Sequence, residues 1–125
     1  IENSISYSES RDLLNDRPLR HTPPLFGKFS FTYSNKKNQI GYFISYNGKK
    51  QLKNFSVSEL NKLYLYTDSG SPSWITHNFF YKFNYNYFIN FDFGIDNIFD
   101  IHYRTYSSGI SAPGRNIRLG LNLKF

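Results

Sequence analysis

The final stretch of the chain, residues 115–125, alternates strictly between apolar and polar side chains. The odd positions carry Ile117, Leu119, Leu121, Leu123 and Phe125, and the even positions carry polar residues or glycine. Because successive side chains of a β-strand point to opposite faces, this pattern predicts a strand with one apolar and one polar face. A helix would scatter these leucines around its circumference. The pattern leaves open whether the apolar face meets a protein core or lipid.

Four further stretches alternate in the same way, namely residues 26–35, 38–47, 74–83 and 85–95, and residues 4–8 alternate weakly. The connections between these predicted strands are short at residues 36–37 and 84–86, and long at residues 48–72 and 96–114. Residues 1–24 are expected to be mostly loop. Within the first long loop, residues 56–62 predict one helical turn with Ser56 or Ser58 as its N-cap.

Strands of about ten residues are long enough to cross a hydrocarbon layer when they are tilted. Alternating short and long connections place all short turns at one end of a meander, as in transmembrane barrels. Tyrosines gather at the short-turn end of the apolar face, where an amphipathic ring suits a membrane interface; they are Tyr33, Tyr42, Tyr81, Tyr85 and Tyr87. The sequence therefore predicts an all-β fold, an antiparallel up-and-down transmembrane meander of five or six strands.

Composition narrows the function classes. The chain has no Cys, which excludes disulfides and thiolate chemistry, and its three histidines lie far apart without metal-ligand spacing. No phosphate-binding loop or nucleophile elbow is present, so we expect no enzymatic activity and no cofactor. The net charge is +6, but the basic residues are dispersed rather than clustered, so no nucleic-acid binding is expected.

Two other interpretations stay open at this point. One is a soluble antiparallel binding module, whose apolar face would cover its own core. The other is a barrel pore or translocator without a plug. A closed barrel needs about eight strands, so we expect this chain to be part of a larger barrel. The last strand should then have an unpaired edge, or a partner outside these residues.

Several spaced motifs resemble those of one family. Residues 94–104 follow the pattern G-x-[DE]-N-[LI]-F-D-x-x-Y-R through Gly94, Asp96, Asn97, Ile98, Phe99, Asp100, Tyr103 and Arg104. Residues 108–116 (SGISAPGRN), 70–78 (GSPSWITHN) and 17–27 (RPLRHTPPLFG) add further matches, and Phe125 matches an aromatic C-terminus. In these motifs the chain resembles the C-terminal β-barrel segment of TonB-dependent outer-membrane receptors.

This resemblance implies that residues 1–125 are the C-terminal portion of a 22-stranded barrel domain, with the plug domain absent. Such receptors sit in the outer membrane of Gram-negative bacteria. They import a scarce ligand, a ferric siderophore, haem or cobalamin, with energy supplied through TonB. The implied partners are outer-membrane lipid and lipopolysaccharide, the remainder of the barrel and the plug, the TonB complex through that plug, and the small-molecule ligand.

Aromatic and arginine side chains of the long loops are the candidate ligand-binding residues, because they suit an anionic, aromatic ligand through stacking and charge. They are Tyr64, Tyr66, Trp74, Tyr103, Arg104 and Tyr106. For any one of them, packing of the loops on themselves is the simpler alternative. A second prediction places Lys49, Lys50 and Lys53 against lipopolysaccharide phosphates.

Overall fold

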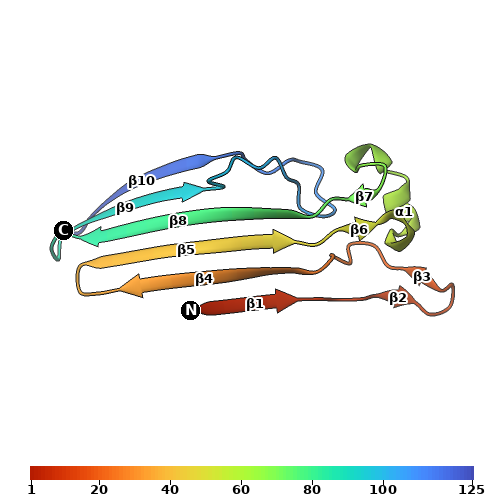
Figure 1. Cartoon of the computed structure of the whole chain (residues 1–125), viewed down its shortest axis with the longest axis horizontal. Helices are drawn as coiled ribbons and strands as arrows, with labels where there is room; N and C mark the ends of the chain where they lie inside the picture. The colour runs from red at the N-terminus through yellow and green to blue at the C-terminus, as the bar shows by residue number, and fades with distance from the viewer.

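The computed structural model describes all 125 residues and is built around one antiparallel sheet of six strands (Figure 1). In sheet order these are β1 (Glu2–Ser6), β4 (Phe26–Ser34), β5 (Asn38–Asn47), β8 (Trp74–Asn84), β9 (Ile89–Asp96) and β10 (Asn116–Leu123). Sheet order follows chain order, and every neighbouring pair is antiparallel. The predicted all-β meander is confirmed, and β1 and β10 form its two edges.

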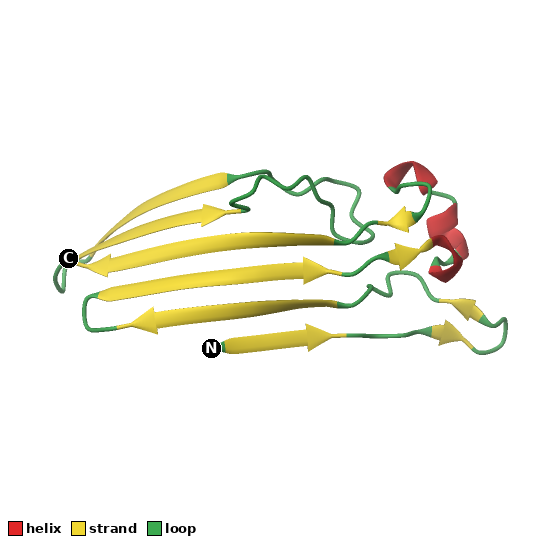
Figure 2. Ribbon diagram, viewed as in Figure 1, coloured by secondary structure: helices red, strands yellow, loops and turns green.

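The connections separate by length to the two ends of the sheet. The short turns at residues 35–37 and 85–88 lie at the left in Figure 1, and the long connections lie at the right. The long connections carry the small pairs β2 (Arg11–Asp12) with β3 (Arg17–Pro18) and β6 (Lys50–Gln51) with β7 (Gly70–Ser71), and the helical turns η1 (Leu52–Asn54), α1 (Val57–Leu60) and η2 (Leu63–Leu65). Figure 2 shows these helical turns at the long-loop end. None of the helices has the length and apolar character needed to span a membrane.

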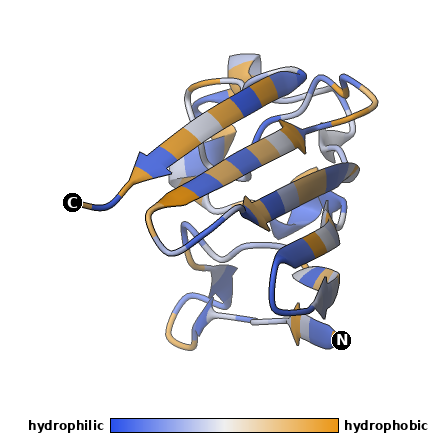
Figure 3. Ribbon diagram, turned by 90° about the vertical axis from the view of Figure 1, so that its left-hand side faces the viewer, coloured by the Kyte–Doolittle hydropathy of each residue, from blue (hydrophilic) through white to orange (hydrophobic).

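The register sorts side chains into rows that run across the strands. One row joins Phe31, Tyr42, Phe79, Ile95 and Ile117, from β4 to β10. The next row joins Thr32, Gly41, Phe80, Gly94 and Arg118, and it points to the opposite face. Figure 3 shows the resulting alternation of hydrophobic and hydrophilic residues along the strands. The predicted pattern of one apolar and one polar face is therefore present in the sheet, with Phe80 an exception on the polar side.

Glycines on the polar face make room for long side chains of the neighbouring strand. The Phe80 ring occupies the place that a Cβ atom of Gly41 would need. A Cβ at Gly94 would lie 2.9 Å from the Arg118 guanidinium, which crosses it from β10. These glycines allow an aromatic ring and a guanidinium group to lie across the sheet instead of projecting from it.

The sheet is a single layer and has no hydrophobic core. Only 13 of the 125 residues are buried, and the one buried hydrophobic side chain, Phe55, lies in a long loop rather than in the sheet. On the apolar face, Leu119 is 82% exposed and Phe31 is 49% exposed. Since an uncovered apolar face of this extent is unfavourable in water, the sheet needs an apolar environment or a covering layer from outside the chain.

The largest difference from a predicted strand boundary is at the start of β9. The predicted strand 85–95 begins at Ile89, because residues 85–88 form a turn. The Asn86 side-chain oxygen accepts hydrogen bonds of 2.9 Å from the N–H groups of Phe88 and Ile89, a local bond that competes with the strand ladder. Tyr85 and Tyr87 therefore lie in the turn rather than on the strand face.

Candidate functional site

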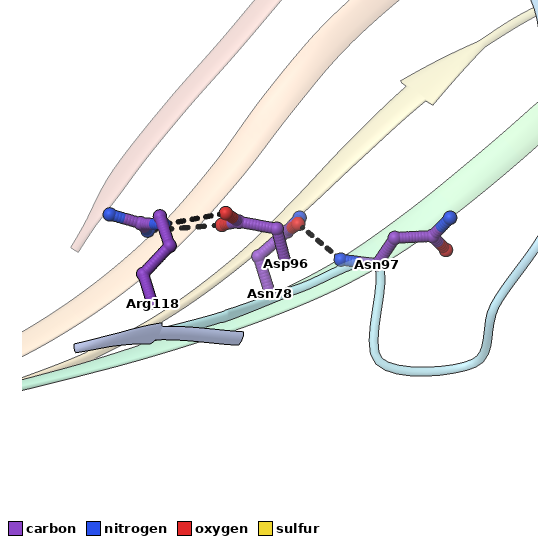
Figure 4. Close-up of polar contacts among 4 residues, drawn as sticks. All are labelled: Asn78, Asp96, Asn97 and Arg118. Carbon is purple, nitrogen blue, oxygen red and sulfur yellow. Dashed lines mark hydrogen bonds and ion pairs between the residues drawn. The ribbon is translucent and has the colours of Figure 1, made fainter. Parts of the chain in front are cut away.

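Asn97 fastens the second long loop, residues 97–115, directly after β9. It is 3% exposed and has a left-handed backbone (φ +50°), a conformation that asparagine tolerates better than most residues. Its side chain donates to the carbonyls of Ile101 (2.9 Å) and Pro113 (3.3 Å) and accepts from the Ile101 N–H (2.9 Å). Its own N–H donates to the Asn78 side chain on β8 at 2.9 Å (Figure 4). One residue thus joins both ends of the loop to the sheet.

Two carboxylates complete this anchor. Asp96 accepts two hydrogen bonds from the Arg118 guanidinium, at 2.6 and 3.1 Å (Figure 4), which join β9 to β10 on the polar face. Asp100 accepts from the Arg115 N–H at 2.7 Å, and the Arg115 side chain donates to the Ile98 carbonyl at 2.9 Å. The conspicuous Asp and Asn residues that follow Gly94 in the sequence therefore hold the loop in place.

A cluster of aromatic rings packs the two longest loops against each other. Phe55 lies between Tyr66 and Tyr106, with ring centres 4.7 and 5.7 Å away and edge-on geometry. The two tyrosine rings are 6.0 Å apart. Because Phe55 and Tyr66 come from the first loop and Tyr106 from the second, this loop cluster is a small core at the long-loop end of the sheet.

The Glu59 carboxylate joins three segments next to this cluster. It is 5% exposed and accepts hydrogen bonds of 3.0 Å from the N–H groups of His21 and Ser56. Ser56 is the N-cap of α1, one of the two caps predicted from the sequence. Burial raises the pKa of Glu59, but the nearby Tyr106 hydroxyl and the N–H groups of Ser56 and His21 favour the charged carboxylate and outweigh burial, so the pKa falls below its ordinary value.

Lys50 and Tyr106 face this carboxylate. The Lys50 ammonium donates to the Thr22 carbonyl at 2.5 Å and lies 4.3 Å from the centre of the Tyr106 ring. Burial lowers the pKa of Lys50, while burial and the adjacent charge of Glu59 raise the pKa of Tyr106. Lys50 is 8% exposed, so the structure removes it from the three lysines predicted to meet lipopolysaccharide; Lys49 and Lys53 are exposed.

Low pH should destabilise the loops around the loop cluster, because it protonates Glu59. Because the folded-state pKa of Glu59 is depressed, its contribution to stability is fully present above the unfolded pKa, about 4.3, and is lost as the pH falls through the folded value. We expect the protection of the Ser56 and His21 amides, measured relative to their intrinsic exchange rates, to decline as the pH falls below about 4.3 and through the depressed folded pKa of Glu59, where the carboxylate that accepts these hydrogens is neutralised. A Glu59→Gln variant should show weaker protection at neutral pH and little further change in this window. An acid response as large in that variant would assign the effect to other groups.

The six predicted ligand-binding residues do not form one surface. Tyr66 and Tyr106 belong to the loop cluster, whereas Trp74 stacks on Tyr103 with ring centres 4.4 Å apart. Arg104 donates to the Leu65 carbonyl at 2.9 Å and thereby connects the two loops. Tyr64 is 82% exposed and takes part in neither ring group. Their role in ligand binding stays a prediction; Tyr66, Tyr106 and Arg104 make contacts between the loops, and Trp74 and Tyr103 join the start of β8 to the second loop.

Sequence reasoning missed Phe55, Glu59 and the hub role of Asn97. A signal for Glu59 was available, because Ser56 and Glu59 have the spacing of a capping box. No comparable signal existed for Phe55, since its burial depends on tyrosines far along the chain.

The side chains hold no candidate metal centre. No group of three or more His, Cys, Asp or Glu side chains converges. Each histidine instead meets one hydroxyl group: His21 meets Ser107 at 2.7 Å, His77 meets Tyr42, and His102 meets Ser111 at 3.1 Å.

The fold and the loop arrangement define a class of architecture: a single-layer antiparallel meander with two open edges and its long loops gathered at one end. A solved structure with this fold is the copper transporter OprC, which this chain matches with a TM-score of 0.75 and 19% sequence identity. The match covers 98% of this chain and 20% of the OprC chain, and at this identity it shows the fold alone. The sequence matches no protein-family model and no curated protein.

Proposed function

We propose that this chain is the C-terminal barrel segment of a TonB-dependent receptor in the outer membrane of a Gram-negative bacterium. The complete receptor would import a scarce ligand of the ferric siderophore, haem or cobalamin type. In this proposal the apolar face meets lipid, the polar face lines the lumen, and the long loops point outward. The role is transport rather than catalysis, and the remainder of the barrel, the plug and the TonB complex are its partners.

The uncovered apolar face carries this proposal. Strands β4, β5 and β8 have 9 to 11 residues, the length that crosses a hydrocarbon layer when tilted. Tyr33 and Tyr81 lie at the short-turn end of that face, where both neighbour Ile40 across the sheet, whereas Tyr42 lies in the mid-strand row of Phe31. The placement of Tyr33 and Tyr81 fits an interfacial belt of aromatic residues. The similarity in fold to OprC supports this proposal, and so does the resemblance of the four spaced sequence motifs to those of TonB-dependent receptors.

The two edges of the sheet agree with a position inside a larger barrel. β10 pairs only with β9, and β1 pairs only with β4. An open edge is not tolerated in lipid, because its N–H and C=O groups lack partners. Under the proposal, further strands supply those partners.

OprC is a copper transporter, and copper is the substrate of that protein. In this chain the loops bring together aromatic rings, hydroxyl groups and cations rather than several metal-binding side chains. These groups favour an organic ligand that arrives with any metal already bound.

Detergent dependence tests the proposal. The 125-residue chain, expressed alone, should be insoluble in buffer and should give a β-rich circular dichroism spectrum only with detergent micelles or lipid vesicles. Its apolar face would then be covered by acyl chains. A monodisperse monomer in buffer without detergent would overturn the membrane assignment and favour a soluble binding module.

A further inference from the structure

The end of the sheet that carries the short turns has charged groups of one sign only. Figure 1 shows this end at the left, where the β4–β5 turn, the β8–β9 turn and the end of β10 come together. Its exposed cations are Lys36, Lys37 and Lys124, which we call the short-turn lysines. None of the nine acidic residues lies in the segments 33–38, 84–91 or 121–125 that form this end. The acidic side chains instead lie farther along the strands and in the long connections.

The short-turn lysines have no acidic partners in space. Both ion pairs of the protein are made by arginine side chains, and neither pair includes a residue of this end. Lys82, on the neighbouring part of β8, lies opposite Asp92 in the ladder and is therefore not counted with the group. The positive charge of the short-turn lysines is thus not compensated within the chain.

Backbone hydrogen bonds hold the three segments of this end in fixed relative positions. The Asn35 side-chain oxygen accepts a hydrogen bond of 2.9 Å from the Lys37 N–H, which closes the first turn. The Lys37 carbonyl accepts from the Asn84 N–H at 2.7 Å, and the Phe88 carbonyl accepts from the Lys124 N–H at 2.9 Å. These bonds use the backbone of the lysines and leave their ammonium groups free.

The short-turn lysines lie beside the tyrosines at the same end. The Lys124 ammonium is 5.4 Å from the centre of the Tyr87 ring. Tyr33 precedes Lys36 by three residues, and Tyr85 directly follows β8. In a bilayer, tyrosine rings lie at the level of the headgroups, and lysine side chains extend their ammonium groups toward the polar interface. Under the proposed membrane assignment, the short-turn lysines therefore lie at the depth of the lipid phosphates.

We propose that the short-turn lysines bind the phosphate groups of anionic phospholipids in the leaflet on the short-turn side of the membrane. Each lysine near an anionic membrane surface favours binding by about fivefold, and here three lie on segments that are joined to each other. This site is at the opposite end of the sheet from Lys49 and Lys53, which were predicted to meet lipopolysaccharide. The inference rests on the proposed function, since it needs the apolar face to meet lipid, and it adds the headgroup class and the residues that bind it.

The test measures which lipids lie next to the short turns of the complete barrel in vesicles. A bimane fluorophore is attached at the exposed position Tyr85 through Tyr85→Cys, in a barrel with no other cysteine. Brominated phosphatidylglycerol and brominated phosphatidylcholine quench it in separate titrations, which together give the relative affinity of this site for an anionic and a zwitterionic headgroup. We expect phosphatidylglycerol to bind about fivefold more tightly than phosphatidylcholine.

Two triple variants assign this preference to its residues. Lys36→Gln/Lys37→Gln/Lys124→Gln should reduce the preference to less than about twofold, and unchanged quenching by phosphatidylcholine would show that the variant is still inserted. The matched control Arg17→Gln/Arg20→Gln/Lys62→Gln removes the same charge from exposed positions in the long connections. Those positions lie at the far end of the sheet, beyond a Debye length of about 8 Å, so the control should keep the preference within about 1.5-fold.

Three results would overturn the lipid site. They are equal affinity for the two lipids in the unmodified barrel, an unchanged preference in the short-turn variant, and an equal loss of preference in both triple variants, which would mean attraction by net charge. In each of these cases a fluorophore quenched by both lipids still places the apolar face in lipid, so the receptor proposal stands. A fluorophore that neither lipid quenches rejects the receptor proposal together with the site.

Discussion

Under the proposed membrane assignment, replacing Phe31 with arginine should lower the free energy of unfolding of the complete barrel by about 2–4 kcal/mol, the effect of a cation on a lipid face near the bilayer midplane. Phe31 lies in the row that crosses the middle of β5 and β8, and its side chain is on the uncovered apolar face. A denaturant titration of the complete barrel in lipid vesicles measures the loss.

Thr32→Arg is the matched control. Thr32 is the next residue of β4 and points to the polar face, opposite Gly41. In a water-filled lumen the same charge should cost less than about 1 kcal/mol, as lumen positions tolerate such changes. Equal costs at the two positions would contradict the assignment of lipid to the apolar face, and so would a negligible cost at Phe31.

Replacing Asn97 with alanine should release the second long loop. The variant loses the three side-chain hydrogen bonds that Asn97 makes to Ile101 and Pro113, at about 0.5–1.5 kcal/mol each. Alanine in the left-handed conformation adds about 1–2 kcal/mol. The sum predicts that the Ile101 amide exchanges roughly 100-fold faster or more, while amides between β4 and β5 keep their protection.

Two variants separate the causes of this effect. Asn97→Gly removes the same hydrogen bonds, but glycine adopts the left-handed backbone conformation without strain. The loop in this variant should therefore be about 1 kcal/mol more stable than in Asn97→Ala. Asn116→Ala removes an exposed asparagine whose side chain makes no hydrogen bond, and it should leave the loop protected. Unchanged exchange at Ile101 in Asn97→Ala would show that the loop is held by other contacts.

The strands were predictable because the apolar and polar residues of each strand alternate within its own short sequence. In residues 38–47 the alternation alone fixes both the strand and its orientation, and β5 has these bounds. The start of β9 was not predictable from the pattern. The hydrophobic alternation continues through residues 85–88, but the side chain of Asn86 favours a turn there. A single side-chain oxygen that accepts two backbone hydrogens outweighs the pattern at that point.

The loop contacts were less predictable, because they join residues far apart in the sequence. Composition pointed to Tyr66 and Tyr106 as exposed ligand-binding residues, but burial of both depends on Phe55, which the pattern does not single out. Lys50 looks like its neighbour Lys49 in the sequence, yet one is buried against Thr22 and the other is exposed. The two lysines differ only because the folded chain brings the segment of Thr22 against Lys50 and leaves Lys49 in solvent.

The glycines of the polar face have a consequence for the lumen that we propose beside it. The Phe80 ring lies where a Cβ of Gly41 would be, and the Arg118 guanidinium lies 2.9 Å from where a Cβ of Gly94 would be. In the proposed barrel, a molecule that moves along this part of the face would meet a ring and a guanidinium plane lying against the strands. A side chain placed on Gly41 or Gly94 would displace that ring or guanidinium from the sheet, so the substitution would narrow the proposed lumen through its neighbour as well as through its own volume.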